Sequence, residues 1–148
     1  MAHMEIIDAS ENQLSQILKI ESECFSCPWT HEQLALQLDK SCHIFLAAAE
    51  GETVLGYVGM MHVLDEGYIS NIAVSAALRR CHVADALLAA LEARAREKRL
   101  SFISLEVRDS NTSARRLYEK HGFEEVGRRA RYYEKPAEDA IICTKWIN

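Results

Sequence analysis

The chain has 148 residues, 49% of them hydrophobic, and a formal net charge of −5 at pH 7. This length and composition suit one domain with a buried core and exclude a disordered tail. The negative charge argues against nucleic acid as the main partner, because neutralising phosphates requires a basic face. No run of about eighteen apolar residues occurs, so the sequence predicts no membrane partner or membrane span.

The sequence predicts a reduced, cytoplasmic protein organised as a single domain. It contains five cysteines, an odd number, and its first residues lack the apolar core of a signal peptide. We interpret residues 1–3 as a cloning remnant before a native start at Met4, so the domain is expected to span residues 4–148. For the oligomeric state we expect a monomer or a weak dimer.

Hydrophobic spacing predicts the elements of the first half of the chain. Leu14, Ile17, Leu18 and Glu21 recur at helical spacing and predict an amphipathic helix. Downstream of Pro28, a capping-box pattern opens a second, short helix. The expected elements are strands over 5–7, 43–49, 53–63 and 68–74, and helices over 11–24 and after the capping pair Thr30 and Gln33.

The second half of the chain alternates helices and strands. A stripe formed by Leu87, Leu88 and Leu91 predicts a long helix that begins at Val83. The other expected elements are strands over 102–107, 123–133 and 140–146, and a helix over 111–121. Two βα units with hairpins on either side predict an α/β fold of the α+β type, with a mixed sheet flanked by helices.

One segment late in the chain combines groups that suit acyl transfer. Glu106 is expected on a strand, Asn111 opens a turn, and the following helix presents Tyr118 before it stops at Gly122. A base on a strand and a proton donor on the next helix form a recognisable catalytic arrangement. Each group also has a purely structural interpretation. Glu106 could be a solvated or paired group on the surface, as strand glutamates usually are, and Tyr118 could pack on the face of its helix. Asn111 could simply cap the helix that follows it.

The string LEVR…N…A…LYE…GF in residues 105–123 resembles the GNAT acyltransferases, which use acetyl-CoA, and is close to their RimI-like, ribosomal-protein alanine branch. The resemblance covers about residues 6–144 and implies the GNAT fold, with a mostly antiparallel, twisted central sheet and about four helices. It implies an enzyme that transfers acetyl directly from acetyl-CoA to a protein N-terminus, such as that of a ribosomal protein. Glu106 then corresponds to the general base, and Tyr118 to the acid that protonates the CoA thiolate.

The resemblance also implies the contacts of acetyl-CoA. The family has a six-residue pattern: Gln or Arg, any two residues, Gly, any one residue, then Gly or Ala. In this chain the pattern corresponds to Arg79, Arg80, Cys81, His82, Val83 and Ala84. A strand-to-helix turn presents N–H groups to a pyrophosphate. Glycine lets phosphate oxygens approach the backbone, so His82 in its place predicts weakened binding. The implied partners of the rest of CoA are the backbone of Ile72, Ala73 and Val74, which also supplies the oxyanion donor, and the side chain of Asn111.

Aromatic side chains are expected to line the acceptor groove. The resemblance implies this role for Trp29, in an F…PW segment, and for Tyr132 and Tyr133, although strand aromatics also pack across a sheet. Cys24, Cys27, Cys42 and His43 have residue types that bind zinc. The family places an apolar residue at the position of Cys27, and we expect no metal.

Two other functions stay open at the level of the sequence. The chain could be a GNAT enzyme that acetylates a small amine or a lysine, or a catalytically silent acyl-CoA-binding domain, which the histidine at position 82 motivates. Freeing an α-amine of pKa near 8 costs about 1.4 kcal/mol at neutral pH, against about 4.6 kcal/mol for a lysine. A single carboxylate base is therefore compatible with an α-amine acceptor.

Overall fold

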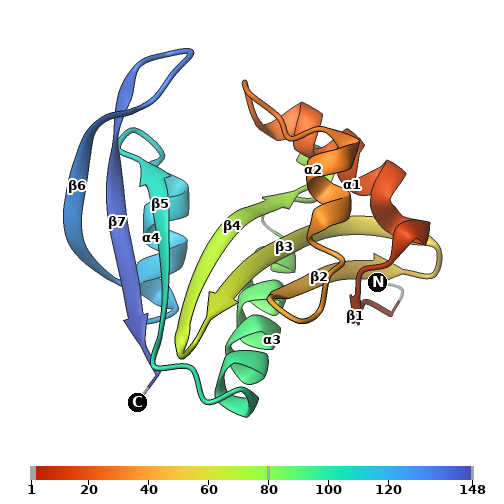
Figure 1. Ribbon diagram of the computed structural model, residues 1–148. Coiled ribbons are helices and arrows are strands. Elements are labelled where there is room, and N and C mark those ends of the chain that lie inside the picture. The colour runs from red at the N-terminus through yellow and green to blue at the C-terminus, as the bar shows by residue number, and fades with distance from the viewer. Residues whose placement is uncertain (1–2, 80, 148) are drawn as a thin grey trace.

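The structure is a computed structural model that describes residues 3–79 and 81–147. Seven strands and four α-helices follow one another within these residues (Figure 1). In order they are β1 (Glu5–Asp8), α1 (Glu11–Cys24), α2 (His31–Leu36), β2 (His43–Glu50), β3 (Thr53–Val63), β4 (Glu66–Val74), α3 (Val83–Glu97), β5 (Phe102–Arg108), α4 (Thr112–Lys120), β6 (Glu124–Tyr133) and β7 (Glu138–Trp146).

The strands form one sheet in the order β1-β2-β3-β4-β5-β7-β6. Neighbouring strands are antiparallel except β4 and β5, which are parallel. The register of β4 with β5 joins only Glu66–Tyr68 to Phe102–Ser104, and beyond it the two strands diverge (Figure 1). The middle of the sheet therefore opens at the carboxyl ends of β4 and β5.

Two hydrophobic cores lie on opposite faces of the sheet, as the alternation along β2 shows. Ile44, Leu46 and Ala48 belong to the core that contains the apolar stripe of α3. Phe45 and Ala47 belong to the other core, together with the buried residues of α1 and α2. Successive strand residues point to opposite faces, so a strand covered on both sides reads as a continuous apolar run.

The structure confirms the predicted order of elements and the predicted fold class. The largest differences lie at strand ends: β4 begins at Glu66, because this residue pairs with Val63 across a tight turn, and β7 begins at Glu138, which pairs with Tyr133. A 3₁₀ turn over Ala76–Leu78 was not expected. Among the described residues, no helix has the length and apolar character needed to cross a membrane.

Candidate active site

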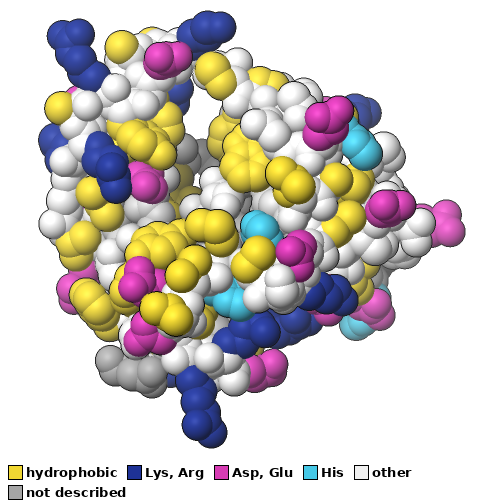
Figure 2. All heavy atoms as spheres, viewed as in Figure 1, with side chains coloured by type: hydrophobic (Ala, Val, Ile, Leu, Met, Phe, Trp, Pro, Cys, Tyr) yellow, Lys and Arg dark blue, Asp and Glu magenta, His cyan; other side chains and the backbone are white. Residues whose placement is uncertain are grey.

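The divergence of β4 and β5 exposes one face of β5 near its carboxyl end. Ile103, Leu105 and Val107 are buried in the core that contains α3, so Glu106 between them faces the other side. In Figure 1 the α1–α2 segment lies on one side of the divergence and the β6–β7 hairpin on the other, and Figure 2 shows the surface hollowed between them. The predicted base therefore stands on a strand that borders an open hollow.

Glu106 is half-buried and has a cationic neighbour from another strand. Its side chain is 29% exposed, and one carboxylate oxygen lies 3.9 Å from Nε of Arg129 on β6. Tyr133 at the end of β6 is also an electrostatic neighbour: burial raises the pKa of Tyr133 to about 12, and the charges of Tyr132 and Glu106 contribute. Tyr133 therefore keeps its proton at neutral pH beside the carboxylate.

Tyr118 on α4 is buried in the core and retains its phenolic proton. Only 6% of the residue is exposed, and its ring packs on Phe123 with centroids 5.7 Å apart. Burial raises the pKa of Tyr118 well above its usual range, and the charges of Cys143 and Tyr133 add to this shift. The packing interpretation is thus confirmed, and a protonated phenol is the form that a proton donor needs.

The N-terminus of α3 is built differently from the other helix starts. Ser10, Thr30 and Asn111 cap α1, α2 and α4 through their side chains, whereas the His82 side chain makes no capping hydrogen bond to α3. The imidazole instead lies 3.1 Å from the carboxylate of Asp85 through Nδ1. The first-turn amides of α3 consequently have no cap from the residue that normally supplies one.

The backbone of His82 has the left-handed conformation, with φ 63° and ψ 19°. Glycine adopts this conformation without steric cost, which explains the glycine of the family pattern at this position. His82 therefore holds a conformation that glycine adopts more readily than any other residue. An uncapped helix start that follows a sheet strand fits the pyrophosphate of acetyl-CoA.

The other residues of the predicted CoA loop are placed as follows. Cys81 is exposed, and Arg79 donates from a guanidinium nitrogen to the sulfur of Cys24, 3.4 Å away. Val83 is buried and begins α3, with Ala84 after it. Arg80 lies outside the described residues.

The strand segment Ile72, Ala73 and Val74 pairs with β3 along one edge only. Its other edge lies on the side of β5, beyond the point where the pairing of β4 with β5 ends and the strands diverge. A free strand edge offers alternating N–H and C=O groups to an extended ligand. The Val74 carbonyl also accepts a contact of 3.5 Å from the Cys24 thiol.

Asn111 caps α4, as one of the two interpretations of the sequence predicted. Its side-chain oxygen accepts a hydrogen bond of 3.2 Å from the Ala114 backbone. The capping role is compatible with a CoA contact through the amide nitrogen, which stays a prediction.

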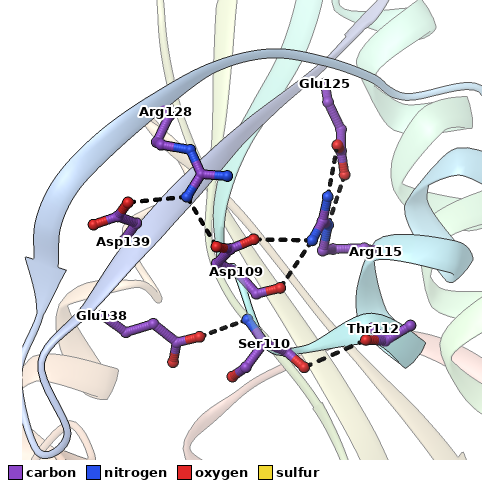
Figure 3. A network of polar contacts seen from close by, with 8 residues as sticks. All are labelled: Asp109, Ser110, Thr112, Arg115, Glu125, Arg128, Glu138 and Asp139. Carbon is purple, nitrogen blue, oxygen red and sulfur yellow. Dashed lines mark hydrogen bonds and ion pairs between the residues drawn. The ribbon is translucent and has the colours of Figure 1, made fainter.

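A polar network ties the loop before α4 to the β6–β7 hairpin (Figure 3). Asp109 accepts hydrogen bonds from Arg115 and Arg128, and Arg128 also bonds to Asp139 of β7. The backbone N–H of Ser110 donates to Glu138, 2.5 Å away. The network joins the Asn111 loop to the hairpin that carries the two tyrosines, so the two parts are held in one arrangement.

The predicted acceptor aromatics lie on two separate parts of the chain. Tyr132 and Tyr133 contact each other edge to face at 5.1 Å, and the Arg108 guanidinium covers the Tyr133 ring at 4.5 Å. Trp29 is half-buried in the α1–α2 segment and lines a hollow with Leu36 and other residues of α2. The structure thus brings Tyr133 into the electrostatic neighbourhood of Glu106. The α1–α2 segment, to which Trp29 belongs, lies on the other side of the divergence of β4 and β5 (Figure 1).

Sequence reasoning missed the contacts of two charged residues, Arg129 and Glu21. Arg129 lies in the basic stretch of residues 128–131, and nothing local distinguishes it from a solvated arginine. Glu21 is 1% exposed, and its position in the apolar stripe of α1 was a signal that could have identified it. Across residues 3–79 and 81–147, no group of three or more His, Cys, Asp or Glu side chains is placed to hold a metal.

Comparison with known proteins identifies the family. The model of the acetyltransferase (GNAT) family matches residues 14–123. A ribosomal protein bS18-alanine N-acetyltransferase of Haemophilus influenzae is 34% identical over 148 residues, covering 97% of this chain and 100% of the relative. The protein of the same name in Escherichia coli is 33% identical over 125 residues, covering 83% and 84%.

Solved structures agree with the sequence comparison. The crystal structure of the ribosomal-protein-S18-alanine N-acetyltransferase from Escherichia coli superposes with a TM-score of 0.92 and 28% identity, covering 99% of this chain and 95% of that chain. Arabidopsis thaliana NAA60 in complex with acetyl-CoA has the same fold, with a TM-score of 0.89 and 18% identity over 97% and 99% of the two chains. The family match and the two relatives confirm the predicted acetyltransferase, and the chain belongs to the GNAT family of acetyltransferases.

Proposed function

We propose that this chain acetylates the N-terminal α-amine of a protein, with a ribosomal protein that begins with alanine as its acceptor. The observation that carries the proposal is the position of Glu106, half-buried on the strand that borders the hollow between the α1–α2 segment and the β6–β7 hairpin (Figures 1 and 2). Relatives named for alanine acetylation of ribosomal protein bS18 align with 83–97% of this chain at 33–34% identity, which supports this class of acceptor.

The residues of the chain then have separate roles in the transfer. Bound acetyl-CoA supplies the acetyl thioester. Glu106 takes a proton from the acceptor ammonium, directly or through water, and so frees the amine lone pair for attack. A backbone N–H near Val74 donates to the carbonyl oxygen as negative charge develops there. Tyr118, buried and protonated, gives its proton to the departing sulfur.

In this proposal, backbone and loop groups bind acetyl-CoA. The uncapped start of α3 would take the pyrophosphate, with the loop residues Arg79, Arg80, Cys81, His82, Val83 and Ala84 around it. The free edge of Ile72–Val74 would pair with the pantetheine arm, and Asn111 would contact CoA. Trp29, Tyr132 and Tyr133 would line the acceptor side. We propose that the reaction uses no metal. We also propose that residues 4–148 form a single domain, and that the protein works in the cytoplasm as a monomer or weak dimer.

Incubation of the purified protein with acetyl-CoA and an alanine-starting peptide tests the proposal. The peptide should contain an internal lysine, and mass spectrometry should find the new acetyl group on the α-amine. The matched control is the same peptide with a formylated α-amine, which should stay unmodified. Acetylation of the lysine, or of polyamines or aminoglycosides in preference to the peptide, would favour the second enzyme function.

A calorimetric titration with acetyl-CoA separates the remaining alternative. Binding together with peptide acetylation supports the enzyme. Binding without turnover on any amine would support a silent acyl-CoA-binding domain, and no binding would exclude the role assigned to the α3 loop.

A further inference from the structure

Glu21 of α1 is a buried carboxylate that joins four parts of the chain. It is 1% exposed, although it carries an ionisable group. Its Oε1 accepts hydrogen bonds from the Tyr57 hydroxyl of β3 and from Nδ2 of Asn71 of β4, the latter at 2.7 Å. Its Oε2 accepts a hydrogen bond of 2.8 Å from the backbone N–H of Trp29. The α1–α2 segment is thereby connected to the two central strands through one side chain.

All three partners of Glu21 are donors, so the position requires an acceptor on both side-chain oxygens. With the donors placed as they are, a carboxylate offers an acceptor to each of them, whereas the amide of glutamine would place an N–H group against one of them. A buried carboxylate without partners is destabilising by several kcal/mol. Burial and the neighbouring carboxylate raise the pKa of Tyr57 above its usual range, so Tyr57 stays protonated and donates. The cluster is therefore complete as it stands.

The Glu21 hydrogen bonds connect the segment proposed to bind the acceptor with the strand proposed to bind acetyl-CoA. Trp29 belongs to the segment assigned to the acceptor. Asn71 directly precedes Ile72–Val74, the strand segment assigned to acetyl-CoA, and it sits at the register shift between β3 and β4. The Cys24 thiol, one helical turn after Glu21, contacts the Val74 carbonyl at 3.5 Å. The carboxylate therefore connects the acceptor segment with the donor strand.

We propose that Glu21 is a positioning residue for acetyl transfer, which holds the acceptor segment Phe25–Thr30 against β4 through the Trp29 backbone. This inference rests on the proposed function and deepens it. Glu21 does not touch the reacting atoms: it acts by fixing where the acceptor side stands relative to the donor strand.

The test compares two substitutions in the same cluster. Glu21→Gln disrupts the bond to the Trp29 backbone, whereas Tyr57→Phe removes one donor on Oε1 and leaves that bond in place. Both variants lose a buried hydrogen bond, so both should be less stable. Glu21→Gln alone should raise the KM for an alanine-starting peptide about tenfold, the size expected when a positioning contact is lost. The KM for acetyl-CoA should stay within about twofold and kcat within about threefold of the wild-type values.

Amide hydrogen exchange of residues 25–30 gives a second measurement that does not depend on turnover. Exchange should accelerate in Glu21→Gln and remain as in the wild type in Tyr57→Phe. If Glu21→Gln fails to fold, Glu21→Asp keeps the charge but is one methylene shorter, and the same two changes are expected from it.

Three results would overturn the inference. The first is a peptide KM that stays unchanged in Glu21→Gln although amide exchange is faster. The second is a peptide KM that rises equally in Tyr57→Phe, and the third is unchanged amide exchange in Glu21→Gln. If the wild-type protein acetylates no peptide, the proposed function fails, while the exchange comparison still decides whether Glu21 holds the segment.

Discussion

Arg129 of β6 stands beside Glu106 of β5, with its Nε 3.9 Å from a carboxylate oxygen. The arginine side chain is 57% exposed, and ion pairs of this kind contribute at most about 1 kcal/mol in water. The pair is therefore easily separated, and in the proposed mechanism an acceptor ammonium would take the place of the guanidinium next to the carboxylate. Arg129 also lies 5.7 Å from the Tyr132 ring, so one side chain links the proposed base with one of the proposed acceptor aromatics.

Replacing Glu106 by glutamine should remove the base and leave the fold intact. We expect kcat/KM for an alanine-starting peptide to fall about 100-fold or more, the usual contribution of a general base. The melting temperature should hardly change, because the carboxylate is half-buried and its ion pair is weak. Glu124→Gln, at an exposed position of β6, is the matched control and should keep full turnover. Retention of more than half the activity in Glu106→Gln would contradict the assigned role.

The Tyr118→Phe variant separates proton donation from packing. It removes one oxygen and keeps the ring against Phe123, so the core should survive. The rate of CoA thiol release should fall about tenfold to 100-fold, since the departing sulfur would no longer receive a proton from the phenol. Tyr68→Phe, at the far end of β4, is the control and should release thiol at the wild-type rate. Equal rates in the two variants would leave Tyr118 with a packing role only.

His82→Gly should strengthen the binding of acetyl-CoA several-fold. Glycine has no Cβ, so phosphate oxygens could approach the amides of the loop more closely. The left-handed backbone of the histidine costs about 1 kcal/mol in the free and the bound protein alike, so relief of this cost should raise stability and leave affinity unchanged. The contact with Asp85 that is lost is worth little, because the His82 side chain is 79% exposed. Calorimetric titration with acetyl-CoA measures the change.

His82→Ala provides the comparison for this substitution. This variant loses the imidazole ring but keeps the cost of the left-handed backbone conformation. It therefore separates the effect of side-chain bulk on binding from the effect of conformational strain. Weaker or unchanged binding in His82→Gly would show that the histidine does not narrow the phosphate loop.

Asp85 should contribute stability that depends on pH. Its carboxylate contacts His121 at 2.8 Å, Lys120 at 3.0 Å and His82 at 3.1 Å, and the His121 hydrogen bond is the largest cause that lowers the pKa of Asp85. Because the folded pKa lies below the ordinary value of 3.8, the contribution is complete above that pH and is lost as the pH falls below it.

The variant that checks this is Asp85→Asn. At pH 5 its free energy of unfolding should be lower than that of the wild type by about 1 kcal/mol. This is the contribution expected of an ion pair near the surface, because a quarter of the Asp85 side chain is exposed. Urea unfolding at pH 5, 4 and 3 should show the difference between the two proteins narrowing as the pH falls. A difference that stays constant over this range would show that the ionisation of Asp85 is not coupled to folding. Glu32→Gln, on the exposed face of α2, serves as the control.

Local signals were enough to locate most elements of this protein. The helix predicted over residues 11–24 is the observed α1, because its capping box at Ser10 and Gln13 and its apolar stripe all lie within the segment itself. Asn111 was likewise predicted as a cap from its place before a helix. The LEVR…LYE…GF string also indicated the family, since the base and the proton donor lie on adjacent elements.

Only the tertiary structure decided which residues meet across the opening. The sequence predicted a mixed sheet and left open that β7 inserts between β5 and β6, which brings the β6 residue Arg129 to the side of Glu106. Glu21 finds donors 8, 36 and 50 residues away, and no local pattern reports partners at such separations. Spacing along a helix or strand reveals which face a residue occupies, because that periodicity is local. What the face touches depends on chain crossings and strand order, and these are set by the packing of the whole domain.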